Sequence, residues 1–600
     1  MFSPKGLVVE LSRKVVKPLG EEDKIFRLFI GGRGVATYVF WKLGGHRVDP
    51  LSGDNPLIIA TGPLTGTGIP MSGRAAAVFR SPLTGIIGAS NLGGRLGPVM
   101  RFTGVDILAV LGKAERPTYL LIQDGKVEFR DASHLWGKDA IETEEILLKE
   151  HGKNAAVLAI GPAGENLVKF ASINHDIWRQ FGRTGGGAVM GAKKLKAVVF
   201  VPDRQQVEVA MPEKLREFLR EFTPYFVGEK SVKALFDAGT MRLVELANQM
   251  GFFPTYNWQR VSLEGWEKIA WPSFRREYFL RPGACLHCPA ACHRLVESRK
   301  YGVSVDIDYE TVFALGGLTG CADPDEMIRL NDLADRLGMD TISLGNAIAF
   351  AIEAAKMGKL GAKLEWGCGD LAKLVEDIAY RRGVGDILAE GVREAARRLG
   401  LEEIAVHVRG LEPAGYDPRV LKGMALNYAI GYRGADHLAT MAYALDYGGY
   451  AGGPPSLGEE KGRAVAHMEE VSALFDSLVM CKFGRGVYDT YPGGRGFEIF
   501  AQLLTYVTGH KWDGKSVRDV ALRIINLTRV INLEMGAGPD SLPERLYRPV
   551  QFEGKEYRLA LEELEAALKT YYKLRGWDDA GKPTNEVLKE LQLDFLIGAR

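Results

Sequence analysis

Long hydrophobic runs are missing from this chain of 600 residues. No apolar stretch reaches the roughly 18–20 residues that a membrane span requires. The nearest to one, residues 341–358, is interrupted by Asn346 and Glu353. The amino-terminal residues MFSPKGLVVELSRKVV alternate like a strand and lack the apolar segment of a secretory signal. We therefore expect a cytoplasmic protein without a membrane partner.

An excess of charge of either sign is also missing. The chain has 76 Lys and Arg against 75 Asp and Glu, which leaves a formal charge of +1. So balanced a surface does not favour binding to nucleic acid or to an anionic membrane. The length exceeds what one hydrophobic core organises, so we expect about two to four domains.

Cysteine is scarce, with six in the whole chain, which excludes a disulfide framework and predicts a reduced protein. Three of the six nevertheless lie together, as Cys285, Cys288 and Cys292 in a C-x2-C-x3-C array. One interpretation is a structural zinc site of the Cys3His type, completed by His287 or His293. The other is a [4Fe-4S] cluster that takes its fourth thiolate from a distant part of the chain.

The fourth thiolate would come from one of the three remaining cysteines. Cys321 precedes a helix cap and Cys368 lies in a loop, and we expect both to be small buried fillers. Cys481 ends the segment DSLVMC, where a helix gives way to a glycine-containing loop. That position presents a sulfur well, so Cys481 is the predicted fourth ligand, and the two histidines are expected only to flank the array.

Glycine is abundant, at 72 residues in 600, against a usual share near ~7%. The glycines gather in short blocks: GGRG (31–34), TGPLTGTG (61–68), SPLTGIIGASNLGGRLG (81–97) and GRTGGGAVMG (182–191). They are either tight turns between strands or backbone brought close to a phosphate-bearing ligand. No P-loop pattern and no GxGxxG between a strand and a helix is present.

The order of local patterns predicts an α+β fold with a β-rich domain (1–208) and two mainly helical domains (209–405 and 406–600). Short β-branched runs fill residues 1–200, and a polar linker follows at 202–212. Capping residues predict a helix over 323–338 and another from about 340 to 358. A Gly- and Tyr-rich zone over 410–438 is expected to be irregular and to bind a ligand. Further helices are expected at roughly 370–382, 386–399, 463–482, 497–508, 516–532 and 560–574.

Several motifs, in order along nearly the whole chain, resemble those of the tungsten-containing aldehyde:ferredoxin oxidoreductase family. They are GGRG, PLTGTGIPMSGR, SPLTGIIGASNLGG, GRTGGGAVMG, the cysteine array, DYET, DRLGMDTIS and DSLVMCK. The resemblance implies tungsten, or less often molybdenum, held by the dithiolene sulfurs of two pterins beside a [4Fe-4S] cluster. It also implies a base of two β-sheets closed over by two helical domains, with ferredoxin or a ferredoxin-like small subunit as electron partner.

The resemblance assigns cofactor contacts by position. The carbonyls of Asn91 and Thr184 would reach a Mg²⁺ ion that bridges the two pterin phosphates. Arg74 would lie between cluster and pterin, and Cys481 would be the electron exit from the pterin. The contacts in the base domain are Arg74, Asn91, Gly93, Arg183, Thr184 and Gly185, and those in the helical domains include Met339, Arg433, Met480 and Lys482.

Three aspartates look like the paired D-x-x-G-L-(D/C) elements of the family: Asp335, Asp340 and Asp476. A carboxylate can accept two N–H bonds from the guanidine-like edge of a pterin. The alternatives are a solvated helix residue for Asp335 and an N-cap for Asp340. The second element departs from the pattern, because Val479 stands where glycine is usual.

A second departure concerns assembly. Some relatives join subunits through a metal at an E-x-x-H motif, but the matching pair here is Glu326 and Arg329, and arginine is not a metal ligand. We therefore expect a homo-oligomer, if one forms, to lack a metal-bridged interface.

The formaldehyde-oxidising branch of the family uses a glutamate, a histidine and a tyrosine that match Glu310, His437 and Tyr416. The resemblance implies oxidation of a small aldehyde with water, with Glu310 as general base, His437 as proton donor or oxyanion partner and Tyr416 as carbonyl orienter. The alternatives are a first-turn helix carboxylate, a core histidine and a packing tyrosine. Other functions to weigh are a low-potential tungsten reductase of an aromatic thioester or carboxylic acid, and a zinc-stabilised scaffold. No cysteine in 410–440 offers the extra metal ligand expected of such a reductase.

Overall fold

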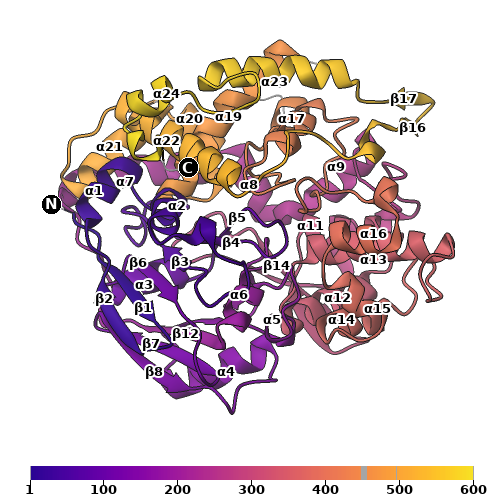
Figure 1. The fold of residues 1–600 in the computed structure, drawn as a ribbon, viewed down its shortest axis with the longest axis horizontal. Coiled ribbons are helices and arrows are strands. Elements are labelled where there is room, and N and C mark those ends of the chain that lie inside the picture. Colours follow the sequence, from indigo (N-terminus) through magenta and orange to yellow (C-terminus); the bar gives the residue numbers. More distant parts are fainter. Residues whose placement is uncertain (1, 448–455, 495, 599–600) are drawn as a thin grey trace.

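Two six-stranded sheets build the amino-terminal region of the computed structural model, which describes residues 2–447, 456–494 and 496–598 (Figure 1). Most neighbouring strands are antiparallel, with parallel pairs β1–β6 and β7–β12. The first sheet has the order β2 (Val15–Pro18), β1 (Gly6–Glu10), β6 (Ile107–Leu111), β3 (Leu57–Ala60), β4 (Ala75–Arg80), β5 (Ile87–Leu92). The second has the order β11 (Arg179–Phe181), β10 (Ile173–His175), β9 (Ala156–Ala159), β12 (Leu195–Val201), β7 (Thr118–Gln123), β8 (Lys126–Asp131).

Side chains alternate along the strands, so the two faces of each sheet pack into different hydrophobic cores. Ile59 and Phe79 of the first sheet share a core with Leu120 and Phe200 of the second. Their neighbours in sequence, such as Ile58, Val78 and Ala109, point the other way into the large helical core. Each apolar run in residues 1–200 that was predicted as a strand contains a strand in the structure. The expected base of two sheets is confirmed.

The helical regions follow, as Figure 1 shows in magenta to yellow. In the first of them the predicted caps are confirmed: Asp323 caps α12 (Pro324–Leu337), which ends at Gly338 in the left-handed conformation with φ 79°. Asp340 then caps α13 (Thr341–Lys356), accepting the amides of Ile342 and Ser343. The other helices of this region are α7 (Pro212–Gly228), α8 (Lys230–Ala238), α9 (Arg242–Met250), α10 (Trp271–Glu277), α11 (Tyr309–Val312), α14 (Leu371–Ala379), α15 (Val384–Leu388) and α16 (Val392–Leu399).

Two predictions about helices are wrong in detail. The single helix expected over 386–399 is divided into α15 and α16, because Gly391 adopts φ 84° between them. The zone 410–438 is not irregular throughout, since α17 (Lys422–Ile430) occupies its middle. The remaining predicted helices appear as α19 (Glu459–Leu478), α21 (Phe497–Thr508), α22 (Gly514–Glu534) and α23 (Leu561–Arg575).

A small third sheet, which the sequence did not predict, supports the cysteine array. It consists of β13 (Phe279–Gly283), β14 (His293–Ser298) and β15 (Val303–Asp306), all antiparallel. The array fills the connection between β13 and β14. Because Gly283 pairs with His293 across the two strands, the ends of this connection are held side by side.

The expectation of a fully reduced chain is wrong. Cys321 and Cys368 form a disulfide across 47 residues, with their Cα atoms 4.5 Å apart. The amide of Gly367 also donates to the carbonyl of Thr319. This hydrogen bond holds the loop that contains Cys368 beside the end of the helix that follows Glu310. Cys321 is buried as expected, but as half of a cross-link. The other four cysteines are free thiols.

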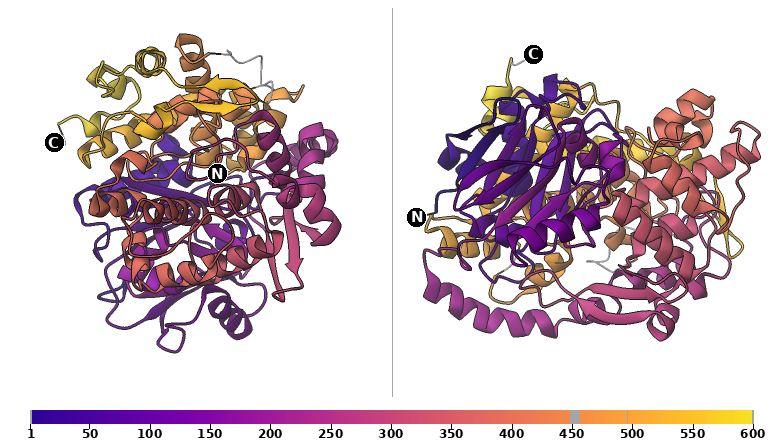
Figure 2. Two further views of the ribbon diagram at one scale, coloured as in Figure 1. Left: turned by 90° about the vertical axis from the view of Figure 1, so that its right-hand side faces the viewer. Right: turned by 90° about the horizontal axis from the view of Figure 1, so that it is seen from below.

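The three regions meet around one centre. Views from two further directions show the sheets on one side and the two helical regions closing over them (Figure 2). Among the helices of the described residues, none is both long and apolar enough to cross a membrane.

Candidate active site

A cavity of about 340 Å³ lies where the first sheet, the cysteine sheet and both helical regions meet. Most of the residues singled out from the sequence line it, although they come from positions more than 400 apart in the chain. They are Arg74, Asn91, Gly93, Arg183, Cys285, Cys288, Cys292, Glu310, Asp335, Met339, Asp340, Tyr416, Arg433, His437, Cys481 and Lys482.

Four predicted residues do not line the cavity: Thr184, Gly185, Asp476 and Met480. The carbonyl of Thr184, proposed for Mg²⁺, accepts a hydrogen bond from Ser81 Oγ at 2.7 Å. Gly185 has φ 87°, and a Cβ there would lie 2.2 Å from the carbonyl oxygen of Lys169. This glycine is required by protein packing.

Asp476 does not line the cavity, but it holds two residues that do. Its carboxylate accepts bonds from Arg33 Nε at 3.0 Å, Asn91 Nδ2 at 2.7 Å and Lys482 Nζ at 2.9 Å. The residue is buried, so these three donors satisfy a charge that water does not reach. Asp476 therefore fixes the side chains of Asn91 and Lys482, two residues that line the cavity.

The four free cysteines meet at one end of the cavity. Hydrogen bonds from the amide of Cys481 to Met71 O (2.8 Å) and from the amide of Arg74 to Val479 O (3.2 Å) bind the Cys481 turn to the chain before β4. The guanidinium of Arg74 also donates to the Cys481 sulfur at 3.3 Å. The predicted fourth cysteine thus lies with the array, whereas Cys321 and Cys368 bond to each other.

Burial, together with the neighbouring thiols, raises the pKa of Cys288 and of Cys292 to about 12. Thiols of this kind stay protonated at neutral pH unless a metal supplies positive charge. The donor set of four sulfurs with flanking arginine therefore fits an iron–sulfur cluster.

The departure at Val479 does not alter the backbone. Val479 adopts φ 51°, the left-handed conformation that glycine favours, and ends α19 there. A β-branched residue is strained in this region, typically by about 1–2 kcal/mol. Gly32 and Gly62 leave space for the side chain of Val479, since a Cβ at Gly62 would lie 2.7 Å from a methyl carbon of Val479.

Asp335 is the buried carboxyl of the other paired element. Its oxygens accept Gln180 Nε2 at 2.6 Å and Asn331 Nδ2 at 3.2 Å. Burial raises the pKa of Asp335 well above its usual value, and Asp332 raises it further. Gln180 and Asn331 also line the cavity and were missed in the sequence, because isolated amides have no distinguishing pattern.

Asp340 combines the two roles considered for it. While it caps α13, its carboxylate also accepts Arg183 Nε at 3.2 Å. Arg183 donates in addition to the carbonyl of Glu412 at 2.5 Å, which joins the base domain to the zone after 410. Both residues line the cavity.

Glu310 lies in the first turn of α11, just before a π-helical turn at Phe313–Gly317. Its Oε2 accepts the amide of Gly415 at 3.0 Å, and its Oε1 has no hydrogen-bond partner among the described residues. Burial raises the pKa of Glu310 to about 8. The carboxyl can therefore exchange a proton near neutral pH.

His437 faces the free oxygen of Glu310, with Nε2 at 3.6 Å from Oε1. Burial lowers the pKa of His437 to about 3, helped by the charges of Arg183, Arg433 and Lys482. The imidazole is thus neutral and can donate from one nitrogen and accept at the other.

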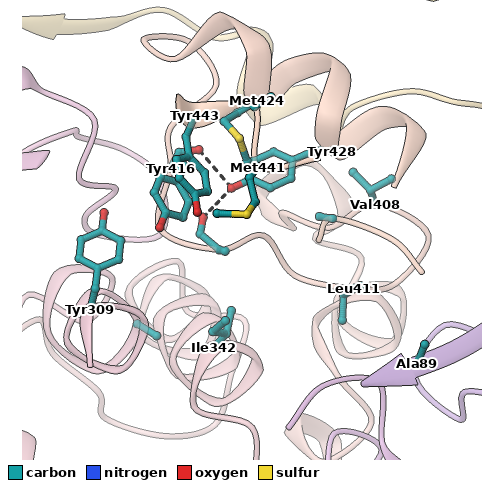
Figure 3. Close-up of a cluster of buried hydrophobic side chains, with 14 of the residues drawn as sticks. Ala89, Tyr309, Ile342, Val408, Leu411, Tyr416, Met424, Tyr428, Met441 and Tyr443 are labelled. Atoms are coloured by element: carbon teal, nitrogen blue, oxygen red, sulfur yellow. Dashed lines mark hydrogen bonds between the residues drawn. The ribbon is translucent and has the colours of Figure 1, made fainter. Parts of the chain in front are cut away.

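Tyrosines wall the cavity beside this pair. Tyr416 stacks on His437 at 5.6 Å between ring centroids and on Tyr443 at 4.3 Å with rings nearly parallel. Figure 3 shows Tyr416 and Tyr443 side by side, with Tyr309 on the neighbouring helix. Tyr428 donates to the carbonyls of Ala414 and Tyr416 and so fixes the backbone that orients Tyr416.

Buried polar atoms without partners point to a bound group. Besides Glu310 Oε1, they include Nε of Arg74 and Arg433 and Nδ1 of His437, judged over the described residues. Such atoms are costly unless a ligand or water satisfies them. All four residues line the same cavity, so the cavity is built for a polar ligand.

A fold of paired sheets under helices, with a cysteine-rich end and a polar cavity, defines a redox metalloenzyme. Family models for the aldehyde ferredoxin oxidoreductases match the chain over 6–202 (N-terminal domain) and 217–593 (domains 2 and 3). The chain belongs to this family.

Named relatives support that membership. A tungsten-containing aldehyde ferredoxin oxidoreductase of Pyrococcus furiosus is 36% identical over 606 residues, covering 97% of each chain. The WOR-like subunit of an aliphatic sulfonate oxidoreductase from the same organism is 33% identical and covers 98% of this chain and 97% of its own. In fold, the chain is similar to the solved active-site complex BamBC of benzoyl coenzyme A reductase with 1,5-dienoyl-CoA (TM-score 0.84, 24% identity, 99% and 97% covered).

The subunit-bridging motif is replaced by an internal contact. Arg329 lies 3.6 Å from Glu326, and Glu326 also accepts a hydrogen bond from the hydroxyl of Tyr301. Glu326 is thus engaged within its own chain.

Proposed function

We propose that this protein oxidises a small aldehyde and water to the carboxylic acid and delivers the electrons to ferredoxin. The observation that supports this most is the pairing of Glu310 with His437 in a polar cavity next to four thiols. Its relatives of the same length include enzymes named for tungsten, aldehyde and ferredoxin.

The proposed cofactors follow from the donors present. Cys285, Cys288, Cys292 and Cys481 would hold a [4Fe-4S] cluster. Arg74, Asn91, Arg183, Asp335, Asp340 and Arg433 would bind a tungsten bis-pterin, and Asn91 would be the Mg²⁺ contact that lines the cavity, whereas the carbonyl of Thr184 is held by Ser81. When bound, the tungsten centre would supply two-electron oxidation of the aldehyde, and the cluster would supply one-electron transfer.

The side chains divide the proton chemistry. Glu310, with a raised pKa and one free oxygen, removes a proton from the attacking water. Neutral His437 donates a hydrogen bond to the carbonyl oxygen as charge develops there. Tyr416, fixed by Tyr428, restricts the orientation of the aldehyde. The neighbouring rings exclude water and leave room for a small substrate.

The alternative of a low-potential reductase is less well supported. It was expected to require a cysteine that binds the active-site metal. All six cysteines lie in the described part of the chain, where four are free and are assigned to the proposed cluster, and two are paired in the disulfide. No thiol is left for that role.

The test is Glu310→Gln, which keeps the shape and removes the titrating oxygen. We expect tungsten and iron contents equal to wild type and a loss of about 10²–10⁴-fold in kcat, the usual contribution of a positioned acid–base group. His437→Ala should fall in the same range and Tyr416→Phe should lose less. A fully active Glu310→Gln enzyme with its metals in place would exclude this mechanism.

A further inference from the structure

His293 immediately follows the cysteine array and begins β14. The sequence suggested that it merely flanks the array, but its ring is directed at one of the sulfurs. Its Nε2 lies 3.5 Å from Sγ of Cys285, within hydrogen-bond distance for sulfur. His287, by contrast, is exposed on the array loop. The two histidines of the array therefore have different surroundings.

The orientation of the His293 ring is fixed by its neighbours. Its Nδ1 lies 3.7 Å from Asp306, whose carboxylate accepts the amide of Arg294 at 2.7 Å and forms an ion pair with Arg179. The Cβ of His293 packs against the backbone of Gly283, where an added Cβ would lie only 3.3 Å away. The imidazole therefore has a defined position next to Cys285.

The direction of the contact follows from the chemistry of the sulfur. A cysteine that binds a metal is a thiolate and can only accept hydrogen bonds. The Cys285 sulfur already accepts the amide of Gly94 at 3.2 Å. An imidazole that carries a proton on Nε2 supplies a second donor to the same sulfur.

His293 is one of the residues that line two neighbouring cavities, together with Trp178, Arg179 and Asp306. It lines the large cavity that contains the array, and it lines a second cavity of about 170 Å³ on its other side. This outer cavity is bounded by Arg281, Gly283 and Ala284, of which Arg281 and Ala284 are exposed. The imidazole therefore lies between the sulfur site and a cavity with exposed lining residues.

We propose that His293 is a positioning residue of the electron-transfer site, donating from Nε2 to the Cys285 sulfur and thereby raising the reduction potential of the bound cluster. Hydrogen bonds to cluster sulfurs stabilise the reduced, more negative state. The inference rests on the proposed function, because it requires a cluster on the four cysteines. It concerns the reduction potential at which that cluster accepts and releases an electron. His293 lies on the side of the cluster site that faces the outer cavity.

The test compares variants that fill a similar space but change the hydrogen-bond donor. His293→Phe fills the same space without an N–H, and His293→Gln restores a donor. His287→Asn is the matched control on the same loop, because asparagine tolerates the positive φ of 58° at that position. The reduction potential of the cluster is measured by redox titration followed by electron paramagnetic resonance, with iron determined in each sample.

We expect the ratio of reduced to oxidised cluster at a fixed potential to fall about tenfold in His293→Phe, which is about 59 mV for one electron. His293→Gln and His287→Asn should remain close to wild type. An unchanged potential in His293→Phe, or an equal fall in the Phe and Gln variants, would overturn the inference. Wild-type protein without iron would instead overturn the proposed function, so the two failures are distinguishable.

Discussion

At the scale of single residues, the site contains buried polar groups whose hydrogen-bonding capacity the protein does not fully satisfy. Glu310 has one oxygen bonded to the amide of Gly415 and one that faces His437. The hydroxyl of Tyr309 holds the carbonyl of the same Gly415, where a Cβ would lie 2.7 Å from the ring of Phe313. The position of the Glu310 carboxyl is therefore set by a close contact that only glycine allows.

The pKa of Glu310 predicts a pH dependence. The ionised carboxylate is the active form of a general base, and burial raises its pKa to about 8. We expect kcat/KM to rise with pH as Glu310 loses its proton and to level off above about pH 8. His437, with its pKa lowered to about 3, stays neutral throughout and adds no second step. A profile for wild type without this rise, or the same rise in Glu310→Gln, would contradict the assignment.

Residues with local chemistry were predictable from the sequence. Asp323 and Asp340 begin their helices as predicted, because capping depends on a few neighbouring residues. The contact of His293 with Cys285 was not predictable, since it depends on the pairing of β13 with β14. Asp476 was identified, but the direction in which its carboxylate points is decided by Arg33, 443 residues away.

At the scale of elements, glycine blocks bring backbone segments into contact. Gly32 begins α2 (Gly32–Lys42), has φ 44° and would place a Cβ 2.2 Å from the carbonyl oxygen of Asp476. The block GGRG thus lies against the end of α19, the helix that leads to Cys481. The sequence indicated that the backbone approaches a neighbour closely at such glycine blocks. At GGRG this neighbour is another segment of the protein.

We predict that Gly32→Ala lowers stability by about 2–5 kcal/mol, because overpacking is added to the cost of left-handed backbone. Gly44→Ala is the control, with φ 75° and no atom within 4 Å of the added Cβ, and it should lose only about 1–2 kcal/mol. Thermal unfolding and iron content measure both effects. Equal losses in the two variants would show that the contact with Asp476 is not tight.

The disulfide is another link between elements, and its pairing could not be read from two cysteines 47 residues apart. It joins the segment after the π-helical turn to a surface loop. Disulfides also occur inside cells in hyperthermophilic archaea, and the relatives come from Pyrococcus and Thermococcus.

Cys368→Ala should therefore lower stability by about 4 kcal/mol under oxidising conditions, since the cross-link restricts the unfolded chain. It should leave iron content unchanged, because Cys368 does not line the cavity that contains the four free thiols. The melting temperatures of wild type and variant, compared with and without a thiol reductant, give the measurement. If reductant did not bring the two together, the cross-link would not be the cause.

At the scale of the whole molecule, the cavity exists only where the regions meet. Asn91 comes from β5 and Arg74 from the chain just before β4, Cys285 and Glu310 from the first helical region, and His437 from the second. The α+β class and the order of regions were predictable, because the strand and helix periodicities change near residue 200. The way in which the regions close on each other was available from resemblance alone.

The central claim is a tungsten enzyme with one cluster, and metal analysis of protein purified without oxygen tests it most directly. We predict about one tungsten and about four iron per chain, with iron lost in Cys481→Ala and retained in Cys321→Ala. Zinc without iron, or full iron retention in Cys481→Ala, would contradict the account.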